Sequence, residues 1–368
     1  MKLFRILLKP KGIIKDIPSS DTIFGAICWG IYIIYGEKKL TEILNNFDGS
    51  DKKFIPSSAF PLLKSENRFI HCLPKPIIPD LKIEEMEEIA KKLKSTIIQK
   101  AEVKIEEENS LQYSKRYVIS QYKSFNKVKY FSESLFTRLI KGEKLNQFYQ
   151  EYLEEKSKII QNDILLTSEE FNQIPRKKIL ELRISVRNKI DRLSFATVPG
   201  GEVYYEREIY FDCEIFYLYF FLLTEDINFF IPIFRWLSDT GIGGDRTVGR
   251  GHYDILEKEI KEFSLPNVNN SNIFISLSKY LPADNEIDWQ SEKNYYQLIP
   301  CQPRLDTMFF KGGEFIKKRI TYLKEGSILQ ATQKKEYYGR LYPSAKFQNY
   351  TIYQCGFTIP VFIKMEEL

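Results

Sequence analysis

The pattern of apolar and polar residues at the start of the chain predicts a strand followed by a buried helix. Residues 3–9 are mostly apolar and end at Pro10, as a strand does before a loop. Apolar side chains then recur at helical spacing, at Ile23, Phe24, Ile27, Ile31 and Ile34. Gly30 within this run would let a neighbouring element approach closely. We therefore expect a helix that packs on a sheet.

Helical patterns dominate the next part of the chain. Residues 74–80 contain three prolines and are typical of a linker. An amphipathic helix is predicted over 83–97, and a second one over 143–160. We expect these helices to form an insertion over about 82–175.

The pattern changes to strands after residue 178. Three strands are predicted over 179–186, 192–198 and 202–211, and the Pro-Gly-Gly sequence at 199–201 predicts a hairpin between the last two. Four further elements are expected: a buried strand over 213–223, a helix over 232–237, a strand over 253–255 and a closing strand over 357–364.

Composition places the chain among folded proteins without membrane spans. At roughly 150 residues per domain, 368 residues suggest two or three domains. The chain is 43% hydrophobic and 28% charged, with a mean hydropathy of -0.32. No uncharged stretch, residues 22–36 included, reaches the roughly 20 residues of a spanning helix, and no signal peptide is evident. We expect a cytoplasmic protein that does not contact a membrane.

Cysteine and histidine usage argues against a metal centre. The five cysteines are scattered without a CxxC pair, and only His71 and His252 could complete a site. We therefore predict neither a metal nor another cofactor.

Positive charge is concentrated in two segments, although the net charge is only +5. Residues 176–192 contain seven basic and two acidic side chains, and residues 311–346 contain nine basic and three acidic ones. Such runs either bind an anionic partner or form solvated faces.

The glycine-rich segment 241–251 is the first candidate for RNA binding. Backbone at Gly243 and Gly244 can approach a phosphate closely, and Arg246 and Arg250 can hold phosphate oxygens with two nitrogens each. The segment lacks the Lys of a Walker A loop, and it follows a helix instead of a strand, unlike a Rossmann loop. The alternative is a glycine-rich bend that closes a sheet.

The second candidate is the basic segment 187–192 and its hairpin. Tyr204 and Tyr205 on the return strand could stack on unpaired bases while basic side chains contact phosphates. An ordinary solvated hairpin is the alternative.

Catalytic residues are few. His252 beside the glycine-rich segment could act as a general base, but a single histidine is more often structural or a phosphate contact. His71 has no evident role. Asp21 occupies a helix-capping position together with Ser19 and Ser20, and we interpret it as structural.

Four motifs in order along the chain resemble one family. They are IPSSDTIFGAICW at 17–29, RNKIDR at 187–192, GIGGDRTVGRG at 241–251 and GFTIPVF at 356–362. The sequence resembles the fourth Csm subunit of type III-A CRISPR complexes, and it does so least over 82–175. The resemblance implies an α+β fold of two ferredoxin-like (RAMP) domains with antiparallel sheets. We place the first domain at 1–177, with the helical insertion, and the second at 178–368, with a β-hairpin thumb.

The resemblance also implies a function. Such a subunit binds the 5′ handle of the crRNA, caps the foot of the complex, and docks the large palm-domain subunit and the first backbone subunit. By motif, the residues expected to contact the handle are Ser19, Ser20, Gly243, Gly244, Arg246, Arg250 and His252, and those of the thumb are Arg187, Asn188, Lys189, Asp191 and Arg192. The subunit would be non-catalytic. The alternatives are a RAMP-type endoribonuclease that processes precursor crRNA and, less favoured, a nucleotide-binding enzyme.

Overall fold

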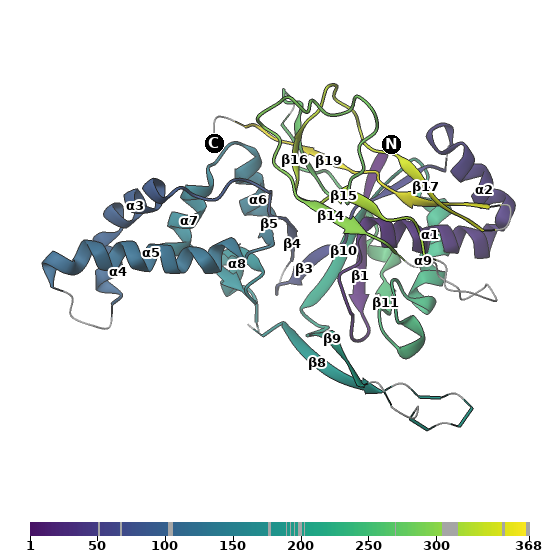
Figure 1. Ribbon diagram of the computed structural model, residues 1–368, viewed down its shortest axis with the longest axis horizontal. Helices are drawn as coiled ribbons and strands as arrows, with labels where there is room; N and C mark the ends of the chain where they lie inside the picture. Colours follow the sequence, from purple (N-terminus) through teal and green to yellow (C-terminus); the bar gives the residue numbers. More distant parts are fainter. Residues whose placement is uncertain are drawn as a thin grey trace.

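The computed structural model has a mixed α+β architecture (Figure 1). It describes residues 1–368 except 51, 67, 102–105, 176–177, 189, 192, 195, 198–200, 202, 269, 304–315, 348–349 and 366–368. The described residues form several sheets and nine α-helices, which confirms the predicted α+β class. None of these helices combines the length and apolar character needed to cross a bilayer.

A ten-stranded sheet runs through the molecule in the order β11-β1-β10-β3-β4-β5-β7-β6, with β12 on β1 and β2 on β10. The strands are β1 (Lys2–Pro10), β2 (Phe54–Pro56), β3 (Phe60–Lys64), β4 (Phe69–Pro74), β5 (Tyr130–Ser132), β6 (Ser157–Ile160), β7 (Ile164–Thr167), β10 (Phe216–Thr224), β11 (Tyr253–Ile255) and β12 (Lys261–Glu262). Every residue of β10 is buried, as expected of a central strand. Because β10 and β11 pair with β1, the sheet crosses the boundary predicted at 177/178.

Two helices lie beside β1 and β10 (Figure 1): α1 (Ser20–Tyr35) and α9 (Ile227–Thr240). A third, α2 (Glu37–Asn45), follows α1 and packs against it farther from these strands. The predicted strand at 3–9, the helix that follows it and the helix at 232–237 are thus confirmed. α1 and α9 approach each other closely at Gly30, because a Cβ atom there would lie 2.3 Å from Ile233 Cγ2. The close approach predicted at Gly30 is therefore present.

The helical insertion contains α3 (Ile83–Lys92), α4 (Lys94–Gln99), α5 (Ser110–Asn126), α6 (Glu133–Ile140), α7 (Leu145–Leu153) and α8 (Ser168–Asn172). The helix predicted over 143–160 is wrong beyond Leu153. Glu155 adopts a positive φ of 62°, and residues 157–160 then pair with β7 as a strand.

His71 helps to join the insertion to the sheet. Its Nε2 lies 3.0 Å from Arg5 Nη1, and its Nδ1 lies 3.0 Å from Glu133 Oε2. Because a guanidinium only donates, Nε2 accepts and Nδ1 donates to the carboxylate. His71 is buried and connects β1, β4 and α6, so it has a structural role that the sequence did not indicate.

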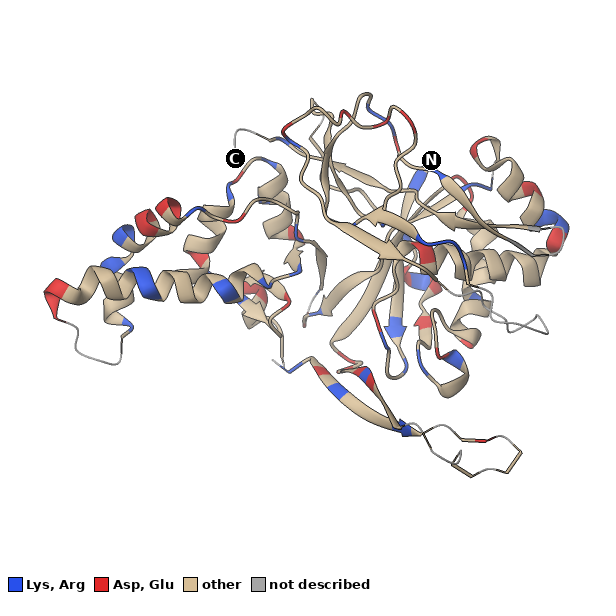
Figure 2. Ribbon diagram, viewed as in Figure 1, with Lys and Arg blue, Asp and Glu red and all other residues tan. Residues whose placement is uncertain are grey.

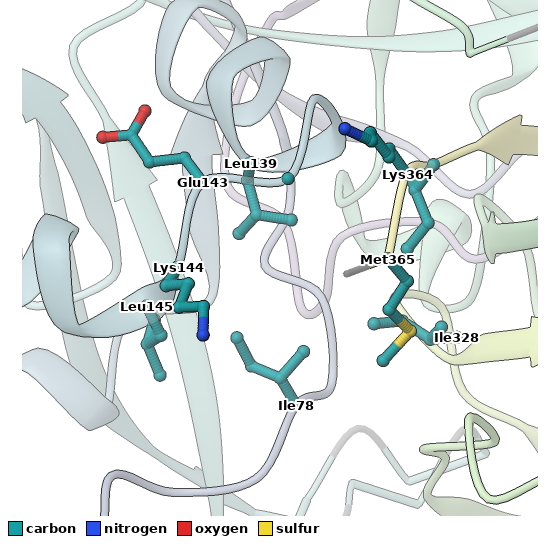
Figure 3. A pocket seen from close by; sticks show the side chains of 10 residues that line it. Ile78, Leu139, Glu143, Lys144, Leu145, Ile328, Lys364 and Met365 are labelled. Atoms are coloured by element: carbon teal, nitrogen blue, oxygen red, sulfur yellow. The ribbon is translucent and has the colours of Figure 1, made fainter. Parts of the chain in front are cut away.

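A small cavity of about 30 Å³ marks a second contact between the insertion and the C-terminal strands (Figure 3). Ile78, Leu139 and Leu145 line it on one side, and Ile328 and Met365 line it on the other. The cavity has room for no more than a few water molecules.

A two-stranded hairpin, β8 (Leu180–Asn188) and β9 (Val203–Phe211), projects from the body (Figure 1). The predicted pairing of 192–198 with 202–211 is wrong, because β9 pairs with β8. Asp191 Oδ1 instead accepts the N–H groups of Leu193 and Ser194, which makes a turn at the tip.

The C-terminal part consists of short strands. They are β13 (Ile273–Ser276), β16 (Ile328–Gln330) and β19 (Pro360–Phe362) in one sheet, and the pairs β14 (Leu298–Cys301) with β15 (Ile320–Leu323) and β17 (Leu341–Phe347) with β18 (Tyr350–Cys355). The described residues after Thr240 contain no α-helix, only the 3-10 turns η3 (Arg246–Val248) and η4 (Glu257–Glu259); η1 (Phe47–Gly49) and η2 (Glu107–Asn109) are earlier ones.

Candidate nucleic-acid interface

The glycine-rich loop connects α9 to β11 and has two parts that differ in packing. At its base, Gly241 and Gly251 cross each other so closely that a Cβ on Gly241 would lie 2.7 Å from the Gly251 carbonyl oxygen. At its tip, Gly243 and Gly244 have no atom within 4 Å of a Cβ position. The base therefore needs glycine to close the bend, whereas the open tip leaves backbone accessible to a ligand.

Arg250 lies at the end of this loop and is almost completely buried. Its guanidinium forms ion pairs with Glu206 (2.5 Å), Glu208 (2.5 Å) and Asp245 (3.4 Å). Burial opposes the charged form, but Glu206 and Glu208 outweigh it and raise the pKa of Arg250. Two of these carboxylates come from β9, so Arg250 fastens the hairpin to the loop.

Arg187 extends this ion cluster to the surface. Its Nη2 lies 2.7 Å from Glu208 Oε1, the same oxygen that Arg250 contacts. The neighbouring Ser185 hydroxyl and the Arg187 guanidinium lower the pKa of Glu208 to about 2. Glu206 and Glu208 were not singled out from the sequence, although their i, i+2 spacing on a strand places both on one face.

Two other predicted thumb residues, Asn188 and Asp191, lie farther out on the hairpin. Asn188 is the last residue of β8 and pairs with Val203. Asp191 forms the turn at the tip, and its two backbone hydrogen bonds lower its pKa. Lys189 and Arg192 lie outside the described residues.

Charges along the hairpin strands are balanced. Basic and acidic residues are mixed along both strands (Figure 2). The charged residues are Glu181, Arg183 and Arg187 in β8, and Glu206, Arg207 and Glu208 in β9. Glu181 pairs with Lys178 at 3.0 Å and with Arg183 at 3.0 Å. The basic character predicted for residues 176–192 is therefore offset within the described strands, and the hairpin does not present a uniformly positive surface there.

His252 holds the tip of the glycine-rich loop. Its Nε2 lies 3.1 Å from the carbonyl oxygen of Arg246, which can only accept, so Nε2 carries the proton and donates. The His252 carbonyl accepts the N–H of Lys11 at 2.9 Å. His252 thus connects the loop at Arg246 with the segment after β1.

The segment after β1 completes the contact between the motifs. Gly251 N–H donates to the Ile13 carbonyl, and Lys15 Nζ lies 3.4 Å from Asp245. Ile14 exchanges two backbone hydrogen bonds with Ile209 of the hairpin, at 3.2 and 2.9 Å. The structure therefore brings together the glycine-rich loop, the base of the hairpin and residues 11–15, which pattern analysis did not identify.

Ser19 and Ser20 face a different neighbour. Ser20 is fully buried, and its Oγ accepts the N–H of Lys279 at 3.1 Å. Ser19 is the N-cap of α1 and donates to Asp21 Oδ1 at 2.6 Å. Asp21 lies in the first turn and pairs with Lys279 Nζ at 3.1 Å, so Ser19 is the N-cap instead of Asp21, and the buried ion pair agrees with the structural role predicted for Asp21.

This start of α1 is an attachment point for the C-terminal strands. Burial opposes ionisation of Asp21, but the Lys279 ammonium and the Ser19 hydroxyl outweigh it and lower its pKa. Ser58 Oγ accepts the N–H of Ser20 at 3.1 Å, and Ser58 N–H donates to the Leu277 carbonyl at 3.0 Å. The side chain of Ser20 therefore forms its hydrogen bond inside the protein. Of Ser19 and Ser20, only Ser19 is partly exposed.

Comparisons with known proteins agree with the motifs. No protein-family model matches the chain. The curated CRISPR system Cms protein Csm4 of Thermococcus onnurineus (strain NA1) is 24% identical over 372 residues, which cover 100% of this chain and 98% of that protein.

Solved structures share the fold. One is the crystal structure of a Csm3–Csm4 subcomplex of the type III-A CRISPR-Cas interference complex, with a TM-score of 0.59, 17% identity, and coverage of 99% of this chain and 100% of that one. Another is a Csm1–Csm4 cassette in complex with cA4, with a TM-score of 0.53, 19% identity and full coverage of both chains. Similarity in sequence over the whole chain, together with the shared fold, confirms the resemblance to the fourth Csm subunit, Csm4, that the motifs predict.

Proposed function

We propose that the chain is the non-catalytic subunit of a type III-A CRISPR interference complex that binds the crRNA 5′ handle and caps the foot of the complex. The observation that carries this proposal is the ion cluster of Arg250, Glu206 and Glu208, because it joins the glycine-rich loop to the hairpin. The two segments predicted independently to contact RNA are thereby adjacent.

Within this site, we assign different roles to the predicted residues. The open backbone at Gly243 and Gly244, together with Arg246, Lys189 and Arg192, would contact handle phosphates. Arg250 is instead a positioning residue, because carboxylates surround its guanidinium. Ser20 likewise positions the start of α1.

The order of elements supports two ferredoxin-like domains in part. β1, α1, β3, β10, α9 and β11 follow one another as β-α-β-β-α-β, with residues 65–215 inserted between β3 and β10. We propose that this set is the first ferredoxin-like domain and that the C-terminal strands are the remnant of a second. This arrangement would replace the linear division at 177/178.

We propose that the neighbours in the cytoplasmic complex are a large palm-domain subunit and a backbone RAMP subunit. The similar solved structures are of Csm1–Csm4 and Csm3–Csm4 assemblies, which supports both partners. No cofactor enters the proposal.

The direct test is to purify the tagged chain from its native host and sequence the 5′ ends of the RNA that accompanies it. A uniform repeat-derived 5′ end, recovered with other Csm subunits, is the expected result. Absence of RNA, or random 5′ ends, would contradict the proposal. In binding assays, Arg246→Ala should lower the slope of log affinity against log salt by about 0.7 for one lost single-strand phosphate contact, while Arg235→Ala, at a distant exposed ion pair with Glu257, should not.

Precursor processing by the chain itself is the alternative. It would need His252 as a general base, but His252 Nε2 is already engaged with the Arg246 carbonyl oxygen. We expect His252→Ala to leave the amount of precursor crRNA in cells unchanged. Accumulation of precursor, with RNA binding intact, would favour the endoribonuclease.

A further inference from the structure

The hairpin β8–β9 carries an exposed apolar face. Side chains alternate along each strand, and the register pairs Val186 with Tyr205 and Ile184 with Arg207 on the same face. Leu182, Ile184 and Val186 are 57%, 72% and 62% exposed, and Tyr205 is 72% exposed. Contiguous aliphatic side chains in solvent are unusual in a folded protein and mark an interaction surface.

The opposite face of the same ribbon is occupied within the chain. Glu206 and Glu208 point to Arg250, and Arg187 reaches the same cluster. Because residues one position apart point to opposite faces, this cluster fixes the apolar face outward. The ribbon cannot turn over to bury its aliphatic side chains without breaking the two ion pairs that Arg250 forms with Glu206 and Glu208.

The charges of the hairpin favour a protein over RNA as the occupant. Arg183, Arg187 and Arg207 balance Glu181, Glu206 and Glu208 in the two strands, so the stem has no net charge. Binding a polyphosphate depends on net positive charge, and aliphatic side chains offer no surface on which bases stack. Tyrosine and arginine surrounded by aliphatic residues are typical of the centre of a protein interface.

Arg207 specifies the partner further. It lies at the middle of the apolar face, opposite Ile184, and is exposed. Among the described residues no carboxylate pairs with it, in contrast to Arg183 and Arg187. A complementary surface therefore has apolar side chains around a single carboxylate.

We propose that the outward face of β8–β9, made by Leu182, Ile184, Val186, Tyr205 and Arg207, docks a segment of a partner protein in which aliphatic side chains surround an acidic residue. This inference rests on the proposed role as a subunit of a larger complex, and it assigns the stem of the hairpin to protein contact. RNA contact is left to the glycine-rich loop and the hairpin tip.

Site-specific crosslinking in the complex purified from the native host tests the proposal. A photoreactive benzoylphenylalanine replaces Ile184 on the outward face or, as a control, Arg183 on the opposite face, which is 56% exposed. We expect position 184 to crosslink to a polypeptide whose crosslinked peptide contains aliphatic residues and an Asp or Glu, with no change after ribonuclease treatment. A crosslink to RNA, no crosslink at all, or equal crosslinking from position 183 would overturn the proposal.

Substitution gives a second measurement. Ile184→Glu and Arg207→Glu should each weaken retention of the crosslinked partner by about 30-fold, as a central interface residue does, while Arg183→Glu should not. The RNA that accompanies the chain is measured in the same samples. If no RNA accompanies any of the variants or the unmodified chain, the handle-binding role alone is contradicted. If RNA is present and retention of the partner is unchanged in the Ile184 and Arg207 variants, the docking surface alone is overturned.

Discussion

Arg250 and Glu208 form an ion pair between the glycine-rich loop and the hairpin that is shielded from solvent. Nη2 and Oε1 lie 2.5 Å apart, and the two side chains are 2% and 3% exposed. Arg187 contacts the same oxygen from the solvent side at 2.7 Å. Because the pair connects the elements that we propose to contact RNA, its removal should affect both stability and the geometry of the site.

Replacing Arg250 should be costly. Arg250→Ala leaves Glu206 and Glu208 with only the half-exposed Arg187 as a cation, and breaking a buried pair costs about 3–5 kcal/mol. We expect a loss of that size in the free energy of unfolding, measured with denaturant. Arg235→Ala removes an exposed ion pair with Glu257 and should cost about 0–1 kcal/mol. Equal losses for the two variants would show that the buried cluster contributes nothing special.

Acid should weaken the same cluster. The pKa of Glu208 in the folded protein is about 2, below its ordinary value of 4.5. A depressed pKa contributes stability that is complete above about pH 4.5 and is lost as the pH falls towards 2. Glu208→Gln removes this contribution, so the difference in unfolding free energy between wild type and variant should shrink between pH 5 and pH 2. A difference that stays constant over this range would contradict the assignment.

The contact between α1 and α9 should be sensitive to a single methyl group. In Gly30→Ala the new Cβ would lie 2.3 Å from Ile233 Cγ2, and the branched side chain of Ile233 has little freedom to move away. Overpacking of this kind costs about 1–3 kcal/mol.

A matched control lies on the same helix. Gly25 has no atom within 4 Å of its Cβ position, so Gly25→Ala should stabilise the protein by about 0.5–1 kcal/mol. In an Ile233→Ala background, Gly30→Ala should cost less than in the wild type. Identical costs in both backgrounds would place the strain elsewhere.

At the tip of the glycine-rich loop, a role of glycine in stability can be tested separately from a role in RNA binding. Gly244→Ala fits the loop, because no atom lies within 4 Å of the added Cβ and the φ angle is not positive. Stability should therefore be unchanged, as judged by thermal unfolding. The added methyl group should keep a phosphate away from the backbone N–H groups of the tip. Loss of one hydrogen bond to a charged group weakens RNA binding by about 1.5–3 kcal/mol. Gly25→Ala serves as the control for binding, and unchanged affinity for Gly244→Ala would remove the tip from the interface.

The local pattern of apolar and polar residues was sufficient to predict those helices and strands whose type depends on residues close in sequence. The strand at the start of the chain, the helix carrying Ile23 and Ile27, the buried run that forms β10 and the helix before the glycine-rich loop all have a period that one segment displays by itself. Gly30 could be recognised as a point of close approach for the same reason, since it interrupts an otherwise apolar helical face.

The sequence by itself thus determined the α+β class, the position of the glycine-rich loop, and the resemblance to the fourth Csm subunit. Tertiary structure alone decided that Arg250 faces Glu206 and Glu208, that Ser20 faces Lys279, and that β9 pairs with β8. The physical reason is that a periodic pattern reports which face of an element is buried but not which distant residue covers it. From sequence alone, an arginine in a glycine-rich loop is interpreted as a phosphate ligand. Only the tertiary structure shows whether carboxylates already surround it.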